Sequence, residues 1–274
     1  MNLLDFIFTE KSDVATSASG WVVTGGESID TLSGNDIISG SGADSGLEVR
    51  SSTLDTGSGN DTISGKGLNY GVSNFLGVII TGEGNDKIFG TESYYGILNR
   101  GVIDLGSGND LAYGSGGYEG ILNAGTILTG LGNDNITGVG SSIGIQNGGS
   151  IDTGDGNDII TGGGRYFGIL NDGFILTGEG NDTVDALTGG FYGGTINLGN
   201  GNDSLKGFGT GMFIGGSGED ALTFNVGTYT ISELGGGDFL IGGSMTVNGF
   251  EKFGLGSNQE DFLVAAEAGS VTFA

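Results

Sequence analysis

Aspartate recurs along this chain at a fixed place in a glycine-rich turn, and that regularity limits the chemistry these carboxylates can perform. The tripeptide Gly-Asn-Asp begins at Gly34, Gly59, Gly84, Gly108, Gly132, Gly156, Gly180 and Gly201. Most intervals are 24 or 25 residues, the last is 21, and a degenerate copy, Gly218-Glu-Asp220, follows after 17. Acids repeated in identical turns suit cation binding better than catalysis, which needs two carboxylates with different environments in one cleft.

Composition supports a cationic partner. The 274 residues include 63 Gly, 33 Asp and Glu and only 8 Lys and Arg, for a net charge of -25. Nucleic acid is a poor partner for such a surface, because phosphate binding needs clustered basic residues. With no His and no Cys, the usual general base, thiolate nucleophiles and zinc-thiolate sites are all excluded.

The turn itself predicts a hard cation as ligand. Glycine tolerates positive φ, so successive carbonyl oxygens can point into one concavity, and the Asp adds a carboxylate. Oxygen ligands of this kind are preferred by Ca2+, and an ion between stacked turns would relieve the repulsion of a row of like charges. Glu83, Asp155 and Glu179 add a second acid to some turns; the alternative is a surface turn without a bound ion. The candidate ligands are Gly34, Asp36, Gly57, Gly59, Asp61, Gly82, Gly84, Asp86, Gly106, Gly108, Asp110, Gly130, Gly132, Asp134, Gly154, Gly156, Asp158, Gly178, Gly180, Asp182, Gly199, Gly201, Asp203 and Asp220.

Short strands must position these turns. Apolar residues recur two positions after each Asp, and again in two further columns, in short β-branched segments bounded by glycine, which indicates strands rather than helices. The first column is Ile38, Ile63, Ile88, Ala112, Ile136, Ile160, Val184, Leu205 and Leu222; the second is Val72, Ile97, Ile121, Ile145 and Ile169; the third is Ile79, Ile103, Ile127, Ile151 and Ile175. A further column, Asn74, Asn99, Asn123, Asn147 and Asn171, predicts a structural asparagine ladder at a bend.

We therefore predict an all-β fold, a parallel β-helix or β-solenoid with ~24-residue coils and a calcium-binding turn ladder along one edge. Three regions are expected: residues 1–24 as an N-terminal strand and linker, 25–220 as the solenoid, and 221–274 as a C-terminal cap. No apolar run approaches the ~20 residues of a membrane span, and the N-terminus lacks a basic segment, so neither a span nor a cleaved signal peptide is expected.

The turn resembles the calcium-binding nonapeptide of repeats-in-toxin (RTX) proteins, G-G-x-G-x-D-x-U-x. The match is close in Thr56-Gly-Ser-Gly-Asn-Asp-Thr-Ile-Ser-Gly65 and in Thr153-Gly-Asp-Gly-Asn-Asp-Ile-Ile-Thr-Gly162. The family's roll carries two turns per coil, whereas this chain has one turn in about 24 residues, and the intervening segment is more similar to coils of filamentous-haemagglutinin-like β-helices. The resemblance, which covers roughly residues 25–220, implies Ca2+ between successive turns. The acidic, aliphatic tail resembles an uncleaved type I export signal, which implies an extracellular or cell-surface location.

Three functions follow from this reading. A secreted structural β-solenoid of a matrix, surface layer or filament is favoured, without enzymatic activity. A carbohydrate-binding adhesin is the alternative, because Tyr94, Tyr118, Tyr166 and Phe191 form one predicted aromatic column, and Tyr70, Tyr95, Phe167 and Tyr192 the next. A polysaccharide lyase or epimerase would need a cleft, most plausibly at 186–200, and more basic residues to hold a polyanion.

The ends of the chain raise the question of self-association. Leu4, Phe6 and Phe8 alternate with Asp5 and Ile7 and predict a strand, which caps its own first coil or completes the edge of a neighbouring copy. Phe250, Phe253, Phe262 and Val264 could receive it in a head-to-tail filament.

Overall fold

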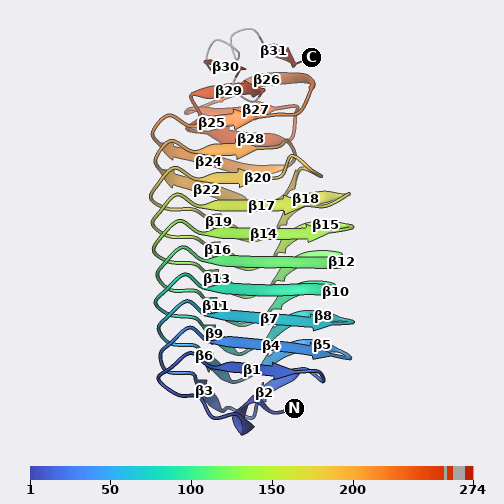
Figure 1. The fold of residues 1–274 in the computed structure, drawn as a ribbon. Helices are drawn as coiled ribbons and strands as arrows, with labels where there is room; N and C mark the ends of the chain where they lie inside the picture. Colours follow the sequence, from blue (N-terminus) through green and yellow to red (C-terminus); the bar gives the residue numbers. More distant parts are fainter. Residues whose placement is uncertain (256–257, 262–268, 274) are drawn as a thin grey trace.

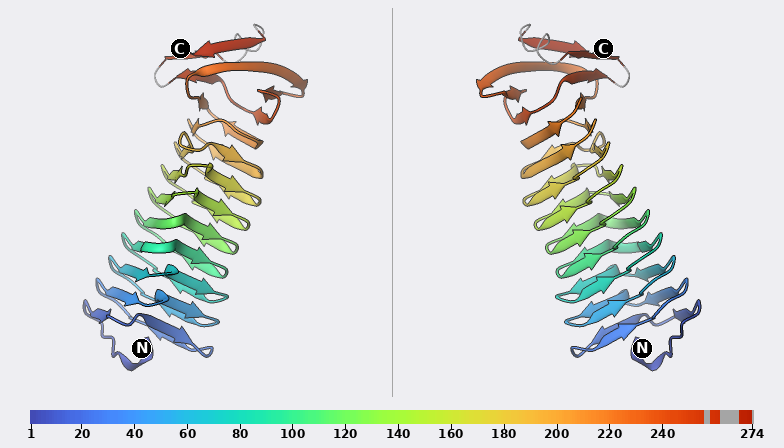
Figure 2. Two further views of the ribbon diagram at one scale, coloured as in Figure 1. Left: turned by 90° about the vertical axis from the view of Figure 1, so that its right-hand side faces the viewer. Right: turned by 90° about the vertical axis from the view of Figure 1, so that its left-hand side faces the viewer.

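Short strands of successive repeats stack in register, each coil above the one before it, in the computed structural model of the chain. The structure describes residues 1–255, 258–261 and 269–273. Figure 1 shows the coils rising from the N-terminus to the C-terminus, and Figure 2 shows the same stack from its two sides. The predicted all-β parallel solenoid with ~24-residue coils is confirmed.

Each regular coil contributes strands to three parallel ladders. The ladder that follows the Asp turn contains β1 (Val14–Ser17), β4 (Ile37–Gly42), β7 (Thr62–Gly67), the first parts of β10 (Lys87–Asn99) and β12 (Leu111–Asn123), β14 (Asn135–Gly140), β17 (Ile159–Gly163), β20 (Thr183–Asp185), β23 (Ser204–Lys206), β25 (Ala221–Thr223) and β29 (Lys252–Leu255). The second contains β2 (Trp21–Thr24), β5 (Ser45–Arg50), β8 (Tyr70–Phe75), the later parts of β10 and β12, β15 (Ile143–Asn147), β18 (Phe167–Asn171) and β21 (Phe191–Tyr192). The third contains β3 (Ser28–Asp30), β6 (Thr53–Asp55), β9 (Val78–Ile80), β11 (Val102–Asp104), β13 (Thr126–Leu128), β16 (Ser150–Asp152), β19 (Phe174–Leu176), β22 (Thr195–Asn200), β24 (Gly211–Ser217) and β28 (Met245–Asn248).

The three apolar columns form one continuous core. Ile88 of β10 lies in register with Ile63 of β7 and with Ala112 of β12, and the second and third columns keep the same one-to-one register. Their side chains are almost fully buried. Because each coil is only a few residues wide, its core side chains pack mainly on the coils above and below, as in other repeat folds.

The predicted asparagine ladder is also present. The Nδ2 group of Asn99 donates to Oδ1 of Asn123 at 2.9 Å, and Asn123 donates to Asn147 at 2.8 Å. Each amide also donates to a backbone carbonyl of the next coil, as Asn99 does to Thr126. The side chains are buried, so this ladder satisfies backbone groups at a bend where the strand hydrogen bonds stop.

The N-terminal segment differs from its prediction. Residues 3–5 form a short 3-10 helix, η1 (Leu3–Asp5), and residues 6–8 form no strand. Leu3 is buried, Phe6 and Phe8 pack against the core, and Asn2 bridges Val22 of β2. Parallel stacking begins with β1, which pairs with β4. In this structure residues 1–8 therefore cover the first coil of their own chain.

The other end leaves the parallel pattern. The strands β26 (Gly227–Gly235), β27 (Asp238–Ile241) and β28 form an antiparallel meander, and β30 (Asn258–Asp261) and β31 (Ser270–Phe273) add antiparallel pairs to β29 and β26. Of the residues proposed to receive a donor strand, Phe250 and Phe253 are buried in the core, and Phe262 and Val264 lie outside the described residues. No helix long and apolar enough to cross a membrane occurs in the described part of the chain.

The aromatic columns were predicted correctly only in part. Tyr94 and Tyr118 stack, but Phe191 lies in register with Ile169 and is buried, and Tyr192 pairs with Leu170. The Gly-Asn-Asp interval falls to 21 residues here, so the shortened coil places Phe191 in the core column.

Candidate cation-binding ladder

The glycines on either side of each turn allow the coils to stack closely. In the second turn Gly57 and Gly59 have φ of 81° and 135°, and the equivalent pairs in later turns repeat these values closely. A Cβ at Gly84 would collide with the carbonyl oxygen of Gly59 in the coil below. The turns therefore require glycine both for backbone conformation and for the approach of the neighbouring turn.

The Asp that follows each turn points inward and binds the preceding coil. The backbone N–H of Asp61 donates to Oδ1 of Asp86 at 2.7 Å, and that of Asp86 donates to Oδ1 of Asp110 at 2.7 Å. The same bond links every successive pair from Asp36 to Asp220, at 2.7–2.9 Å. The structure thus brings all nine predicted aspartates together in one continuous column.

The second oxygen of each of these carboxylates is buried without a partner. No described group hydrogen-bonds the Oδ2 atoms of Asp36, Asp61, Asp86, Asp110, Asp134, Asp158, Asp182, Asp203 and Asp220. Each of these side chains is at most 2% exposed. A buried charge without compensation is costly, so a row of nine requires either protons or cations.

Burial shifts the acidity of the column in the expected direction. Desolvation raises the pKa of Asp110 and of Asp158 to about 7, and that of Asp86 and of Asp182 to about 6, against the lowering effect of the backbone N–H bonds. The neighbouring carboxylates raise the pKa of Asp110 further. Near neutral pH the column therefore holds its charge with difficulty unless a cation is present.

A column of threonines lines the aspartates and was missed from the sequence. Six buried threonines lie five residues before the Asp of their own coil: Thr31, Thr56, Thr81, Thr129, Thr153 and Thr177. The hydroxyl of Thr129 donates to the carbonyl of Thr153 at 3.0 Å and lies close enough to Asp134 to lower its pKa against the larger effect of burial. In the last turn this position is Gly215, where an added Cβ would lie 2.7 Å from Oδ2 of Asp220. The unpartnered oxygens therefore face the threonine column.

The column is interrupted twice. Leu105 and Leu198 occupy the threonine position in their coils and are fully buried in the core. The oxygen-lined corner is consequently divided at these two coils. This difference can be seen in the sequence, where Leu105 and Leu198 begin the motif Leu-Gly-x-Gly-Asn-Asp and other turns read Thr-Gly-x-Gly-Asn-Asp.

Both ends of the Asp column are closed by residues that no motif marked. At the bottom, the N–H of Asp13 donates to Oδ1 of Asp36 at 2.7 Å, while the Asp13 carboxylate turns away to accept from the N–H and hydroxyl of Thr9. At the top, the N–H of Asp220 donates to Oε2 of Glu251 at 2.8 Å. Asp13 and Glu251 thus extend the ladder by one coil at each end although neither belongs to a Gly-Asn-Asp turn.

The Asn of each turn forms a second, outer ladder of opposite direction. The N–H of Asn85 donates to Oδ1 of Asn60 in the coil below at 2.7 Å, whereas the N–H of each Asp donates to the coil above. The second acids Glu83, Asp155 and Glu179 lie exposed on the outside of the turns, away from the buried column. Glu179 accepts a hydrogen bond from Nδ2 of Asn200 at 2.6 Å.

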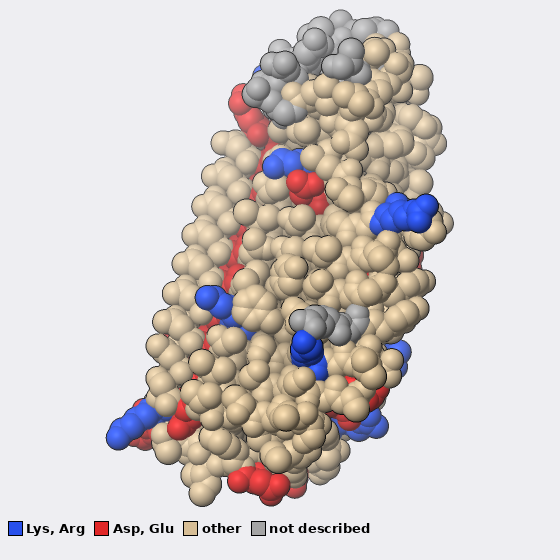
Figure 3. Space-filling view, turned by 45° about the vertical axis from the view of Figure 1, so that its right-hand side comes forward, with Lys and Arg blue, Asp and Glu red and all other residues tan. Residues whose placement is uncertain are grey.

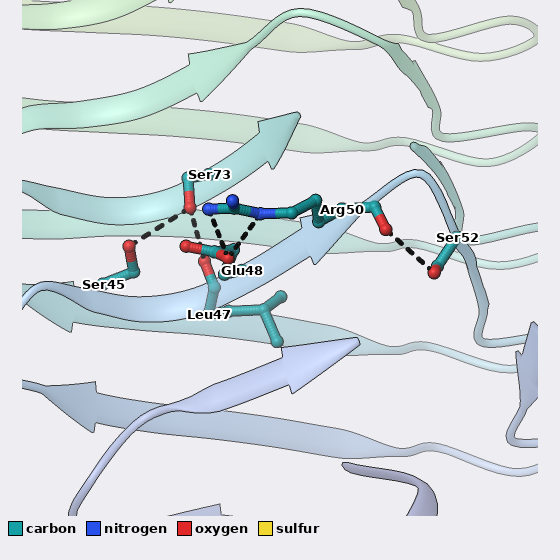
Figure 4. A network of polar contacts seen from close by, with 6 residues as sticks. All are labelled: Ser45, Leu47, Glu48, Arg50, Ser52 and Ser73. Atoms are coloured by element: carbon teal, nitrogen blue, oxygen red, sulfur yellow. Dashed lines mark hydrogen bonds and ion pairs between the residues drawn. The ribbon is translucent and has the colours of Figure 1, made fainter. Parts of the chain in front are cut away.

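No Lys or Arg side chain is hydrogen-bonded to the Oδ2 atoms of the Asp column among the described residues. Figure 3 shows acidic atoms in a narrow seam along the long axis and only scattered Lys and Arg side chains. Arg50 forms an ion pair with Glu48 at 2.8 Å on β5, within the serine network of Figure 4. In that network the hydroxyl of Ser73 in the next coil donates to the hydroxyl of Ser45. Arg50, at the end of β5, is exposed.

The donor set fits a hard divalent cation. It contains carboxylate, hydroxyl and carbonyl oxygens, the ligands that Ca2+ prefers. No three acidic side chains converge on one point among the described residues, so an ion here would combine one or two carboxylates with threonine and backbone oxygens. A bound Ca2+ would supply the positive charge that the buried Oδ2 atoms lack.

Comparison of this chain with protein-family models and with curated protein sequences finds no match. The function is therefore inferred from the fold and from the geometry of the Asp ladder.

Proposed function

We propose that this chain is a calcium-binding structural β-solenoid, exported to a matrix, surface layer or filament outside the cell. The observation that supports calcium binding is the column of nine buried carboxylates whose Oδ2 atoms have no described partner. An ion between adjacent coils would offset both the desolvation and the mutual repulsion of these groups.

Occupancy of these sites is expected to control folding. Each site filled at about ten times its Kd contributes about 1.4 kcal/mol, so several sites together approach the whole stability of a typical domain. Extracellular modules bind Ca2+ in the ~0.1–1 mM range, well above its level inside cells. The chain would therefore remain loosely folded until it reaches the calcium-rich exterior.

The uniform rod supports a structural role for the same molecule. Every regular coil presents the same turn on one edge, and the coils stack into one elongated body (Figure 1). Export by a type I route rests on the resemblance of the C-terminal tail, much of which lies outside the described residues. End-to-end self-association remains part of the proposal, with the condition that residues 1–8 first leave their own coil.

Circular dichroism and calorimetric titration test calcium binding directly. We expect β signal to be lost in chelator and restored by millimolar Ca2+, but not by NaCl at matched ionic strength. Mg2+ should be much less effective, because it demands a regular octahedral shell. A chelated protein that is fully folded and gains no thermal stability from Ca2+ would overturn the proposal.

A further inference from the structure

One column on the second ladder is interrupted by an acid. Tyr70, Tyr95, Glu119, Ile143 and Phe167 lie in register on successive coils, and Glu119 is the only charged residue among them. The backbone of Glu119 pairs with the neighbouring strands as the other residues of the column do. Stacking of the coils therefore does not require a carboxylate at this position.

The Glu119 carboxyl group is buried and incompletely satisfied. The residue is 3% exposed, and Oε2 has no hydrogen-bond partner among the described residues. Desolvation raises the pKa of Glu119 to about 7. Buried carboxyl groups with altered acidity cluster at functional sites, because burying such a group is costly unless it has a partner.

Three tyrosine rings pack together on the two strands that carry Tyr95 and Glu119. Tyr94 and Tyr118 stack at 5.0 Å with an angle of 10°, and Tyr95 meets the edges of both, at 4.9 and 6.2 Å. Tyr95 of β10 lies directly in register with Glu119 of β12, and after burial the Glu119 carboxylate is the largest cause that raises the pKa of Tyr95. Tyr94 and Tyr118 are 47% and 36% exposed, so these two rings reach solvent, whereas Glu119 is buried.

We propose that Tyr94, Tyr95, Tyr118 and Glu119 form a binding site for an organic ammonium ion. Aromatic faces attract alkylated ammonium groups through their quadrupole, and the carboxylate supplies the opposite charge. An anion is repelled by Glu119 and by the net charge of -25, and a neutral ligand leaves the buried charge uncompensated. A ligand would reach the buried carboxylate from the solvent side, where the exposed Tyr118 side chain can reorient quickly.

The site is independent of the Asp column. Tyr95 and Glu119 belong to the second ladder, whereas the aspartates precede the first, so the ammonium site and the calcium sites can be tested separately. The test uses the full chain saturated with Ca2+, so that the Asp column does not compete for the added cation.

Isothermal titration with tetramethylammonium is the direct experiment, at constant ionic strength. We expect millimolar affinity, the range of an exposed cation–aromatic site, and roughly tenfold weaker binding in Glu119→Gln and in Tyr118→Ala. Neopentyl alcohol, which has a similar shape without the charge, and Na+, which has the charge without the methyl groups, should bind at least tenfold more weakly.

Matched variants separate this site from general attraction of cations. Glu27→Gln removes one exposed charge elsewhere, and Tyr192→Ala removes a ring that is 47% exposed and contacts Phe167. Both should bind tetramethylammonium as the native chain does. Equal loss in Glu27→Gln and Glu119→Gln, unchanged binding in Glu119→Gln, or preference for neopentyl alcohol or for glucose would each overturn the proposal. Unchanged circular dichroism of each variant in Ca2+ shows that its fold is intact.

Discussion

Each aspartate of the column is under two opposing influences. The backbone N–H of the preceding coil bonds Oδ1 and stabilises the carboxylate, whereas burial of Oδ2 destabilises it. Burial is the larger effect, because the pKa of the shifted aspartates rises. The carboxylates are therefore poised between protonation and metal binding.

The metal-free protein should lose stability as the pH rises. The folded-state pKa values of Asp86, Asp110 and Asp158 reach about 6 to 7, above the unfolded value of 3.8, so the folded state holds more protons between these limits. Stability is then greatest below about pH 4 and falls as the pH passes through about 6 to 7. Thermal unfolding in chelator at pH 4.5, 6 and 8 measures this, and millimolar Ca2+ should remove or reverse the trend. A melting temperature that rises with pH in chelator would contradict it.

Asp158→Asn should have opposite effects in the two states. The amide oxygen can still accept the N–H of Asp134, but the buried charge is gone. At pH 8 we expect the metal-free variant to gain about 1 kcal/mol, and the calcium-loaded variant to lose a similar amount because one ligand is missing. Chemical denaturation with and without Ca2+ gives both values. Asp172→Asn, on an exposed carboxylate, is the control and should change neither.

Thr129→Val should weaken calcium binding while leaving the side-chain shape nearly unchanged. The hydroxyl lies beside Asp134 and faces the unpartnered oxygens. We expect the calcium concentration that gives half of the thermal stabilisation to rise several-fold, and the metal-free protein to lose about 1 kcal/mol for the lost hydrogen bond. Thr161→Val, on the outward side of β17, is the matched control. Equal calcium dependence in both variants would exclude threonine from the site.

At the scale of the element, glycine has two different roles that substitution can separate. Gly108 has φ of 141°, and a Cβ there would collide with the carbonyl of Gly84, whereas Gly163 at the end of β17 has ordinary φ and open space around it. Gly108→Ala should cost several kcal/mol, since both the backbone and the neighbouring turn must move. Gly163→Ala should be neutral or stabilise by about 0.5–1 kcal/mol through the unfolded chain. Denaturant midpoints in saturating Ca2+ compare them, and similar losses would show that turn stacking is not the cause.

The repeat made the regular coils predictable from sequence. Ile63, Ile88 and Asn99 could be assigned to columns because a fixed period forces equivalent residues into register. The prediction failed where the period is lost: Phe191 shifts into the core after a shortened interval, and residues 4–8 alternate like a strand but lie over the first coil without forming one. The closing groups Asp13 and Glu251 were missed because a single hydrogen bond defines their role, and no glycine pattern accompanies it.

At the scale of the whole molecule, the two ends decide whether the rod stays single. Leu3 is fully buried beneath β2, and Met1 accepts a hydrogen bond from the N–H of Val22. Antiparallel strands close the opposite end. An open parallel edge, the usual route to end-to-end growth, is thus covered at the N-terminal end by the chain's own first residues.

Deletion of residues 1–8 should therefore promote association. The variant exposes the apolar underside of the first coil and the edge of β2, and we expect it to sediment as larger species in Ca2+ at concentrations where the intact protein is smaller. Analytical ultracentrifugation of both chains measures this. Ile7→Ser, at an exposed side chain of the same segment, serves as control. If the intact protein and the deletion variant form the same polymers, the segment is not a cap.

The one-way direction of the aspartate bonds sets an order of assembly. The N–H of each Asp in the column donates a hydrogen bond to the carboxylate of the coil that follows it in the chain. The N–H of the last one, Asp220, donates to the carboxylate of Glu251. A chain that emerges from a channel with its N-terminus first would have every new coil complete the one before it. A chain that emerges with its C-terminus first would instead start from Glu251, and each later coil would find its acceptor already in place, as on a template. Because every Asp N–H donates toward the C-terminal end of the rod, coil-by-coil folding from the N-terminus and folding from the C-terminus should proceed at different rates.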